Sequence, residues 1–161
     1  RRGEEQKSSS PVGERTEVRG NLLWLSKRDF QTVIDHCNAA YPNEACGILG
    51  GKNGRVEKVY LMGNVRPSPV SYEMDGAEQF RVMKDLRQAG MALVGIFHSH
   101  TSSPACPSSV DVEQAYWPGT LYPNYPEAVY VILSLRDQDK PIVKGFLIRD
   151  KEVSEVPVHV E

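Results

Sequence analysis

Residues 91–111 read MALVGIFHSHTSSPACPSSVD, and the architecture of the chain is predicted most clearly from this stretch. Residues 91–97 form a short apolar run without flanking charge, which predicts a buried strand. His98 and His100 follow two positions apart, so an extended backbone directs both imidazoles to the same face of the sheet. Residues 101–107 contain two prolines and three hydroxyl side chains, which predicts a loop.

The segment after this loop, residues 108–115, predicts the start of a helix. Ser108 is a good N-cap residue, and Asp111 falls in the first turn, where it can face the strand end. Two imidazoles and one carboxylate can hold a divalent metal and leave the fourth tetrahedral position open, as in a catalytic zinc site. Ser108 and Asp111 can also form a variant of the capping box and nothing more, although glutamate or glutamine is the usual third residue. Both interpretations remain open at this point.

A glutamate lies well upstream, in the segment YPNEACGILGG of residues 41–51. An isolated glutamate before a strand is usually solvated, and a His-x-His pair alone is a weak signal because unrelated metal folds share it. Here the strand, the histidine pair, the loop and the acidic helix start occur together and in order. Their combination favours a metal site at which an activated water attacks a polarised carbonyl, with Glu44 beside it.

These residues resemble the signature of the JAMM, or MPN-plus, metallopeptidases. That signature is an upstream glutamate, then His-x-His, seven residues, a serine, two residues and an aspartate. It is matched at the right spacing by Glu44, His98, His100, Ser108 and Asp111. The resemblance covers about residues 22–161, and residues 44–51 and 68–72 are most similar to the compact bacterial branch. Some members of that branch trim the C-terminus of ubiquitin-like sulfur-carrier proteins.

The resemblance implies a role for each residue of the signature. His98, His100 and Asp111 would bind one zinc ion, whose bound water would become a nucleophile near neutral pH. Glu44 would take a proton from that water and pass it to the leaving amine. Ser108 would donate a hydrogen bond to the developing oxyanion.

The remaining segments predict an α/β domain of the α+β type, with a mixed, largely antiparallel, curved sheet flanked by helices. The resemblance implies the JAMM/MPN, cytidine-deaminase-like, architecture. Helices are expected to begin after Ser26 and Asp75, and Asn53-Gly54 signals a tight hairpin turn. In the second helix, Phe80, Met83 and Leu86 are expected to form the apolar stripe. The expected strands are residues 22–25, 45–50, 56–62, 91–97, 128–135, 142–148 and 153–160.

Composition limits the domain organisation and the class of partner. Residues 1–20 mix charges with a Ser-Ser-Ser-Pro stretch and predict a disordered tail or linker, whereas residues 21–161 predict a single domain. A net charge of −2 disfavours general nucleic-acid binding. Apolar runs are too short for a membrane span, and three cysteines do not suggest a secreted disulfide framework. We therefore expect a cytoplasmic protein.

Three residues near the signature have two interpretations each. Ser99 lies between the two histidines, so its side chain should point to the opposite face as a buried structural hydroxyl. Cys46 would share the face of Glu44, either lining the site or acting as a small buried residue. Cys106 could form a disulfide, respond to redox conditions, or do neither, and it is not expected to be a metal ligand.

For substrate, the resemblance implies a ubiquitin-like or sulfur-carrier protein whose flexible tail, often ending in Gly-Gly, lies extended along a groove. The aromatic segment around Trp117, residues 116–125, could clasp such a tail or merely cover the core. Two alternatives remain: a metal-free or inactive MPN scaffold that serves as an interaction module, and a RadC-like, DNA-associated protein. The oligomeric state is not predicted.

Overall fold

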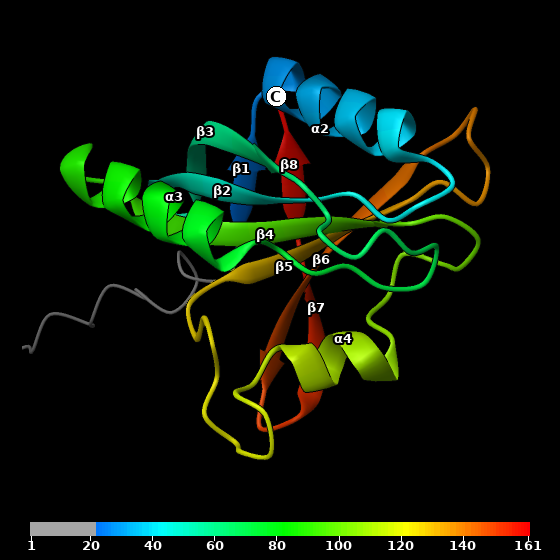
Figure 1. Cartoon of the computed structure of the whole chain (residues 1–161). Coiled ribbons are helices and arrows are strands. Elements are labelled where there is room, and N and C mark those ends of the chain that lie inside the picture. Colours follow the sequence, from blue (N-terminus) through cyan, green and yellow to red (C-terminus); the bar gives the residue numbers. More distant parts are fainter. Residues whose placement is uncertain (1–21) are drawn as a thin grey trace, which may run out of the picture.

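Eight strands form one curved sheet in a computed structural model that describes residues 22–161 (Figure 1). The strand order is β7-β6-β5-β4-β2-β3-β1-β8. The expected tail, residues 1–20, lies outside the described residues. The strands are β1 (Leu23–Leu25), β2 (Cys46–Lys52), β3 (Arg55–Met62), β4 (Ala92–His100), β5 (Val129–Ser134), β6 (Ile142–Arg149), β7 (Glu152–Val156) and β8 (Val158–Val160). The helices are α2 (Lys27–Ala40), α3 (Gly76–Gln88) and α4 (Ser109–Gln114).

The sheet is mixed, as the sequence predicted. Four neighbouring pairs are antiparallel (β2–β3, β2–β4, β5–β6 and β6–β7), whereas β1–β3, β1–β8 and β4–β5 are parallel. The outermost strands, β7 and β8, are separated in sequence by Pro157 alone. The chain therefore passes directly from one edge of the sheet to the other, which requires strong curvature. The predicted strand 153–160 is divided here because proline has no N–H to continue a ladder.

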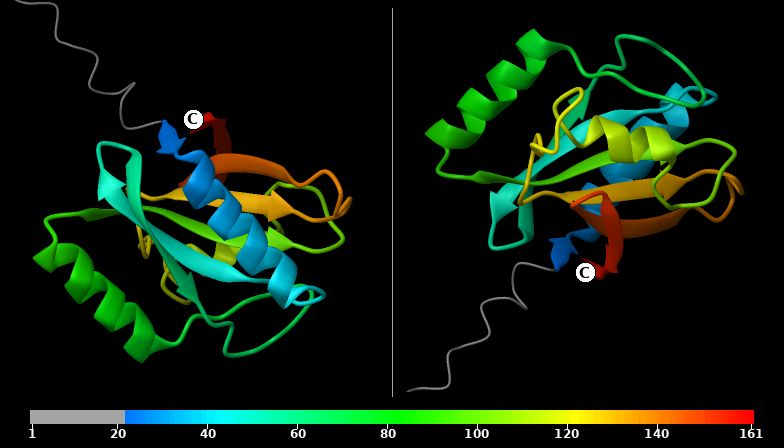
Figure 2. Two further views of the ribbon diagram at one scale, coloured as in Figure 1. Left: turned by 90° about the horizontal axis from the view of Figure 1, so that it is seen from above. Right: turned by 90° about the horizontal axis from the view of Figure 1, so that it is seen from below.

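The helices cover the two faces of the sheet unequally (Figure 2). Cys37 of α2 packs in the cluster that contains Phe97, whereas Leu86 of α3 packs in the cluster that contains Ile48. Ile96, next to Phe97 in β4, belongs to a third cluster with the residues that follow α4. Because successive strand residues point to opposite faces, α2 lies on one face and α3 and α4 lie on the other.

Local sequence signals mark the element ends as expected. The side chains of Ser26, Asp75 and Ser108 each accept a hydrogen bond from a backbone N–H in the first turn of the following helix. Asn53 and Gly54 both have positive φ, 53° and 76°, which matches a tight hairpin turn between β2 and β3.

The predicted apolar stripe of α3 is wrong at Phe80. Its side chain is 71% exposed, while Val82 and Leu86 are buried. Val82 and Leu86 are four positions apart and therefore share one face of the helix. Phe80 precedes Val82 by two positions, about 200° around the helix axis, so it projects away from the sheet.

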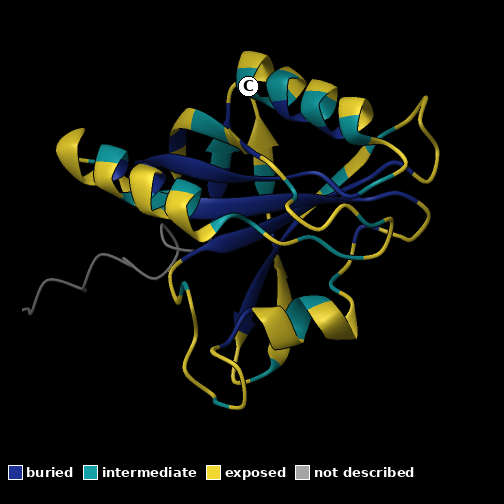
Figure 3. Ribbon diagram, in the orientation of Figure 1, coloured by how far each residue is buried: buried dark blue, intermediate teal, exposed yellow. Residues whose placement is uncertain are grey.

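Strand β4 lies at the centre of the sheet between β2 and β5, and it is buried from Val94 to His100 (Figure 3). His98 and His100 are only 1% and 4% exposed. Buried imidazoles need polar partners, because an unpaired buried polar group is costly. No helix within residues 22–161 is long and apolar enough to cross a membrane.

Candidate metal centre

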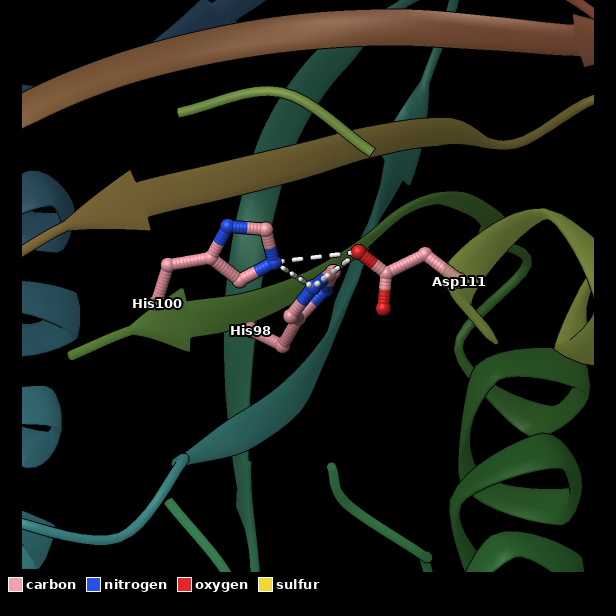
Figure 4. A group of neighbouring side chains, drawn as sticks. All are labelled: His98, His100 and Asp111. Carbon is pink, nitrogen blue, oxygen red and sulfur yellow. Dashed lines mark hydrogen bonds and ion pairs between the residues drawn. The ribbon is translucent and has the colours of Figure 1, made fainter. Parts of the chain in front are cut away.

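Three polar atoms converge at the end of β4 (Figure 4). His98 Nε2 and His100 Nε2 are 3.1 Å apart. Asp111 Oδ2 lies 3.2 Å from His98 Nε2 and 3.0 Å from His100 Nε2. The two imidazoles come from one face of β4 and the carboxylate comes from α4, so the structure brings together the three predicted ligands.

The start of α4 positions Asp111. The Ser108 hydroxyl accepts a hydrogen bond from the Asp111 N–H at 3.1 Å, and Asp111 Oδ2 accepts one from the Ser108 N–H at 2.9 Å. These reciprocal bonds form a capping box. The capping interpretation of the Ser-x-x-Asp spacing is therefore observed, and it orients the carboxylate toward the imidazoles.

The side-chain geometry fits a small divalent cation. In a tetrahedral zinc site the ligand atoms are roughly 3.3 Å apart, as expected from metal–ligand bonds of about 2.0–2.1 Å. The three observed distances, 3.0–3.2 Å, are close to that value. His100 Nδ1 lies 2.8 Å from the Pro104 carbonyl, which can only accept, so Nδ1 carries the hydrogen. Its Nε2 is then free to act as a ligand when the imidazole is neutral.

Without a cation, His100 holds a proton more strongly than a free imidazole does, and Asp111 holds one less strongly than a free carboxyl does. Burial alone would raise the pKa of Asp111, but the hydrogen bonds with His100 and His98 outweigh it and hold that pKa far below its usual range. Burial alone would lower the pKa of His100, but its bonds to Asp111 and to the Pro104 carbonyl raise it. The site therefore stabilises positive charge beside the Asp111 carboxylate, as a cation site should.

Glu44 lies beside these residues because of the β2–β4 register. Cys46 pairs with His98 in the antiparallel ladder, so continuing the register by two residues sets Glu44 opposite His100. The side chain of Glu44 is 3% exposed, and its Oε1 has no hydrogen-bond partner among residues 22–161. Burial raises the pKa of Glu44 to about 7, with a smaller opposing effect from His100. Glu44 can therefore exchange a proton near neutral pH.

The burial of Glu44 predicts a pH-dependent loss of folding stability in the metal-free protein. A folded-state pKa of about 7, above the usual 4.5, means that folding favours the protonated carboxyl. The stability linked to the protonated Glu44 carboxyl is fully present below pH 4.5 and is lost as the pH rises through 7. We expect metal-free Glu44→Gln to exceed wild type at pH 8 by about 3 kcal/mol in free energy of unfolding, with the gap closing by pH 4.5.

Urea denaturation of both proteins across this pH range measures the difference. Groups that do not interact with Glu44 titrate alike in both proteins and cancel in the comparison, whereas the opposing effect of His100 on the pKa of Glu44 is part of the difference that is measured. A difference in unfolding free energy that is the same at pH 4.5 and pH 8 would show that the Glu44 carboxyl is not desolvated.

Tyr72 also belongs to the site, and sequence analysis did not assign it a role. Its ring stacks on the His98 imidazole with centroids 4.8 Å apart and planes 28° apart. Burial raises the pKa of Tyr72 well above its usual value, so the phenol is neutral. The available signal was its place in the segment 68–72, which was recognised only as a family resemblance.

The structure also shows the environments of Ser99, Cys46 and Cys106, which had two interpretations each. The Ser99 hydroxyl is buried on the opposite face and accepts a hydrogen bond from the Ala45 N–H at 2.8 Å, as predicted for a structural hydroxyl. Cys46 is fully buried in the apolar cluster beneath α3. Cys106 is an exposed free thiol, so it forms no disulfide within the described chain.

A groove of about 970 Å³ adjoins the metal-ligand candidates. Tyr72 and the first residues of α4 line it, and so does the aromatic segment 116–125. Tyr116 of that segment is buried and covers the core, whereas Trp117 is 62% exposed at the groove wall, so clasping of a tail by this segment stays a prediction. The lining residues are Tyr72, Glu73, Met74, Gln79, Ile96, Ser109, Val110, Glu113, Gln114, Tyr116, Trp117, Pro118, Gly119, Asn124, Tyr125 and Tyr130.

The fold and the site together define a class of domain, in which a central strand and a following helix bring two imidazoles and a carboxylate close enough to hold one metal ion. The chain belongs to the Prok-JAB family, the prokaryotic homologs of the JAB domain, whose family model matches residues 26–144. The expected JAMM/MPN relationship and architecture are thereby confirmed.

Named relatives support the same assignment. The chain is 36% identical over 130 residues to the CysO-cysteine peptidase of Mycobacterium tuberculosis, covering 80% of this chain and 84% of that one. It is 35% identical over 120 residues to the desampylase of Pyrococcus furiosus, covering 73% and 76%. A solution structure of a Desulfitobacterium hafniense protein is similar with a TM-score of 0.73 and 37% identity, covering 86% of this chain and 92% of that one.

Proposed function

We propose that this protein is a zinc-dependent peptidase that hydrolyses the peptide or isopeptide bond after the C-terminal tail of a ubiquitin-like or sulfur-carrier protein. The observation that carries the proposal is the convergence of His98, His100 and Asp111 within 3.2 Å beside the buried carboxyl of Glu44, whose Oε1 has no hydrogen-bond partner within residues 22–161. The similarity to a CysO-cysteine peptidase and to a desampylase supports both the reaction and the kind of substrate.

His98, His100 and Asp111 would hold a single zinc ion, which supplies Lewis acidity toward a carbonyl and acidifies water. The Pro104 carbonyl fixes the His100 tautomer, and the capping box fixes the Asp111 carboxylate. These bonds hold the His100 and Asp111 side chains in place before substrate arrives, which preorganises that part of the site.

Glu44 would move the proton between the attacking water and the leaving amine. Its pKa of about 7 lets Oε1 both accept and release a proton near neutral pH, which is the property that a general base and then acid requires. Because Oε1 has no partner within residues 22–161, no existing hydrogen bond in the described structure has to be broken first.

Ser108 would stabilise the oxyanion that develops on the scissile carbonyl. Its hydroxyl oxygen accepts from the Asp111 N–H, which leaves the hydroxyl hydrogen available to donate. Capping α4 and donating to substrate are therefore compatible roles for the same side chain.

The groove beside the site would take the tail of the carrier. Tyr72 forms part of its wall and stacks on His98, so a peptide lying in the groove leads to the metal-ligand candidates. An extended peptide can gain backbone hydrogen bonds along such a wall. Glycines at the end of the tail would allow its backbone to approach the buried ligand atoms, because glycine has no side chain to clash.

Intact-mass spectrometry on ubiquitin-like carriers extended past a C-terminal Gly-Gly, by one cysteine or by a short peptide, tests the proposal. Zinc-loaded protein is expected to remove the extension and leave Gly-Gly as the new C-terminus, while the metal-free protein leaves the substrate intact. The same carriers ending in Val-Val before the extension serve as the matched control. Absence of cleavage across the panel despite bound zinc would contradict the proposed substrate class, and absence of zinc binding as well would favour the scaffold alternative.

A further inference from the structure

The side-chain amide of Asn64, just after β3, uses all of its hydrogen-bonding capacity. Its Nδ2 donates to the Glu44 carbonyl at 3.0 Å and to the Ser71 carbonyl at 3.2 Å. Its Oδ1 accepts from the Glu73 N–H at 3.1 Å and from the Arg66 N–H at 3.2 Å. An amide has two N–H donors and an oxygen with two lone pairs, so these four bonds fill it.

The segment that Asn64 organises, residues 64–74, also binds the backbone N–H of Glu44. The Glu44 N–H donates to the Ser68 carbonyl at 2.8 Å, so both backbone groups of Glu44 are bound, one by Asn64 and one by a residue of its segment. The same segment carries Tyr72, whose ring stacks on His98.

The carboxyl of Glu44 depends on this backbone anchorage. Oε1 is buried and meets no partner among residues 22–161, so no hydrogen bond in the described structure holds that oxygen in place. The hydrogen bonds that hold Glu44 in the described structure are therefore those of its backbone. A displacement of about 1 Å in a reacting group can cost on the order of 10²-fold in rate.

We propose that Asn64 is a positioning residue, which holds the Glu44 backbone so that its carboxyl faces the metal-ligand candidates. The catalytic consequence rests on the proposed peptidase function, whereas the anchorage of Glu44 does not. Asparagine suits the position because two carbonyls and two N–H groups converge on it. Aspartate keeps the acceptors for Glu73 and Arg66 but loses the donors to Glu44 and Ser71, so Asn64→Asp removes the anchorage of Glu44 while keeping two of the three bonds that Asn64 makes within its segment.

Amide hydrogen exchange tests the anchorage without any activity measurement. In Asn64→Asp and Asn64→Ala we expect the Glu44 amide to exchange at least about tenfold faster, while the Phe97 amide in β4 stays protected. The segment keeps the bond from the Thr101 hydroxyl to the Pro69 carbonyl at 3.1 Å, so the variants are expected to fold. Arg66→Ala is the matched control, because it removes only an exposed ion pair with Glu73 from the same segment. Unchanged Glu44 exchange, or equal acceleration at Phe97, would overturn the proposal.

A double-mutant cycle with Glu44→Gln tests the catalytic consequence. Asn64→Asp is expected to lower kcat by about 10–100-fold with zinc content unchanged, and to add less than about threefold in the Glu44→Gln background. Equal losses in both backgrounds, or a change confined to KM, would show that Asn64 does not act through Glu44. If wild type cleaves no carrier, the proposed function fails, and the exchange experiment still decides whether Asn64 anchors Glu44.

Discussion

Glu44→Gln is expected to retain bound zinc and to lose about 10²–10⁴-fold in kcat, the contribution typical of general acid–base catalysis. Glutamine has nearly the same shape as a protonated glutamate, so the buried position beside His100 is preserved. It cannot accept and return a proton, and a pKa of about 7 is the property of Glu44 that suits it to this task. The three ligand candidates on β4 and α4 are untouched by the substitution.

Turnover of an extended carrier and zinc content by elemental analysis are measured together on the same preparation. Glu57→Gln makes the same chemical change at an exposed position on β3 and should leave both quantities unchanged. If Glu44→Gln instead loses its zinc in proportion to its activity, Glu44 is a metal ligand and its assignment as a proton carrier is wrong.

Asp111→Asn is expected to lower zinc affinity by at least about 10²-fold, since even changes outside the ligand set can cost that much. The amide oxygen can still accept from the Ser108 N–H, so the start of α4 should persist. What disappears is the negative charge that lies 3.0 Å and 3.2 Å from the two imidazoles. Activity is expected to fall together with zinc occupancy. Competition with a chromophoric chelator measures the affinity.

Ser108→Ala provides the contrast with Asp111→Asn. It removes the hydroxyl that caps α4, at a cost of about 1 kcal/mol in unfolding free energy, but leaves the Ser108 N–H bond to the Asp111 carboxylate. Zinc affinity should therefore change little, whereas turnover should fall if the hydroxyl stabilises the oxyanion.

For the Asp111→Asn variant, full zinc occupancy under chelator competition would remove Asp111 from the ligand set.

Elements with local causes were predicted well from the sequence. The caps at Ser26, Asp75 and Ser108 depend on a side chain and a backbone N–H three residues away. The Asn53-Gly54 turn depends on the ease with which these two residues adopt positive φ. His98 and His100 share a face because strand side chains alternate. The local prediction that failed is Phe80, because packing of α3 against the sheet buries Val82 and Leu86 and leaves Phe80 exposed.

Features that join distant segments needed the tertiary structure. Glu44 lies opposite His100 only because β2 pairs with β4 in one particular register, and a shift of one residue would turn Glu44 to the other face. The stacking of Tyr72 on His98 and the bonds from Asn64 to Glu44 depend on how the segment 64–74 crosses the end of the sheet. Loops of this kind carry little periodicity from which such contacts can be predicted.

The sequence by itself determined the ligand candidates and the helix that presents Asp111, because each depends on neighbours within a few residues. The tertiary structure decided that Glu44 and Tyr72 lie beside those ligand candidates and that the Asn64 amide binds the Glu44 backbone. It also decided how the two edges of the sheet are joined through Pro157. The physical reason is that strand register and loop placement depend on the total burial and hydrogen bonding of the folded chain. No single segment contributes enough to that total for its own sequence to predict its register or its placement.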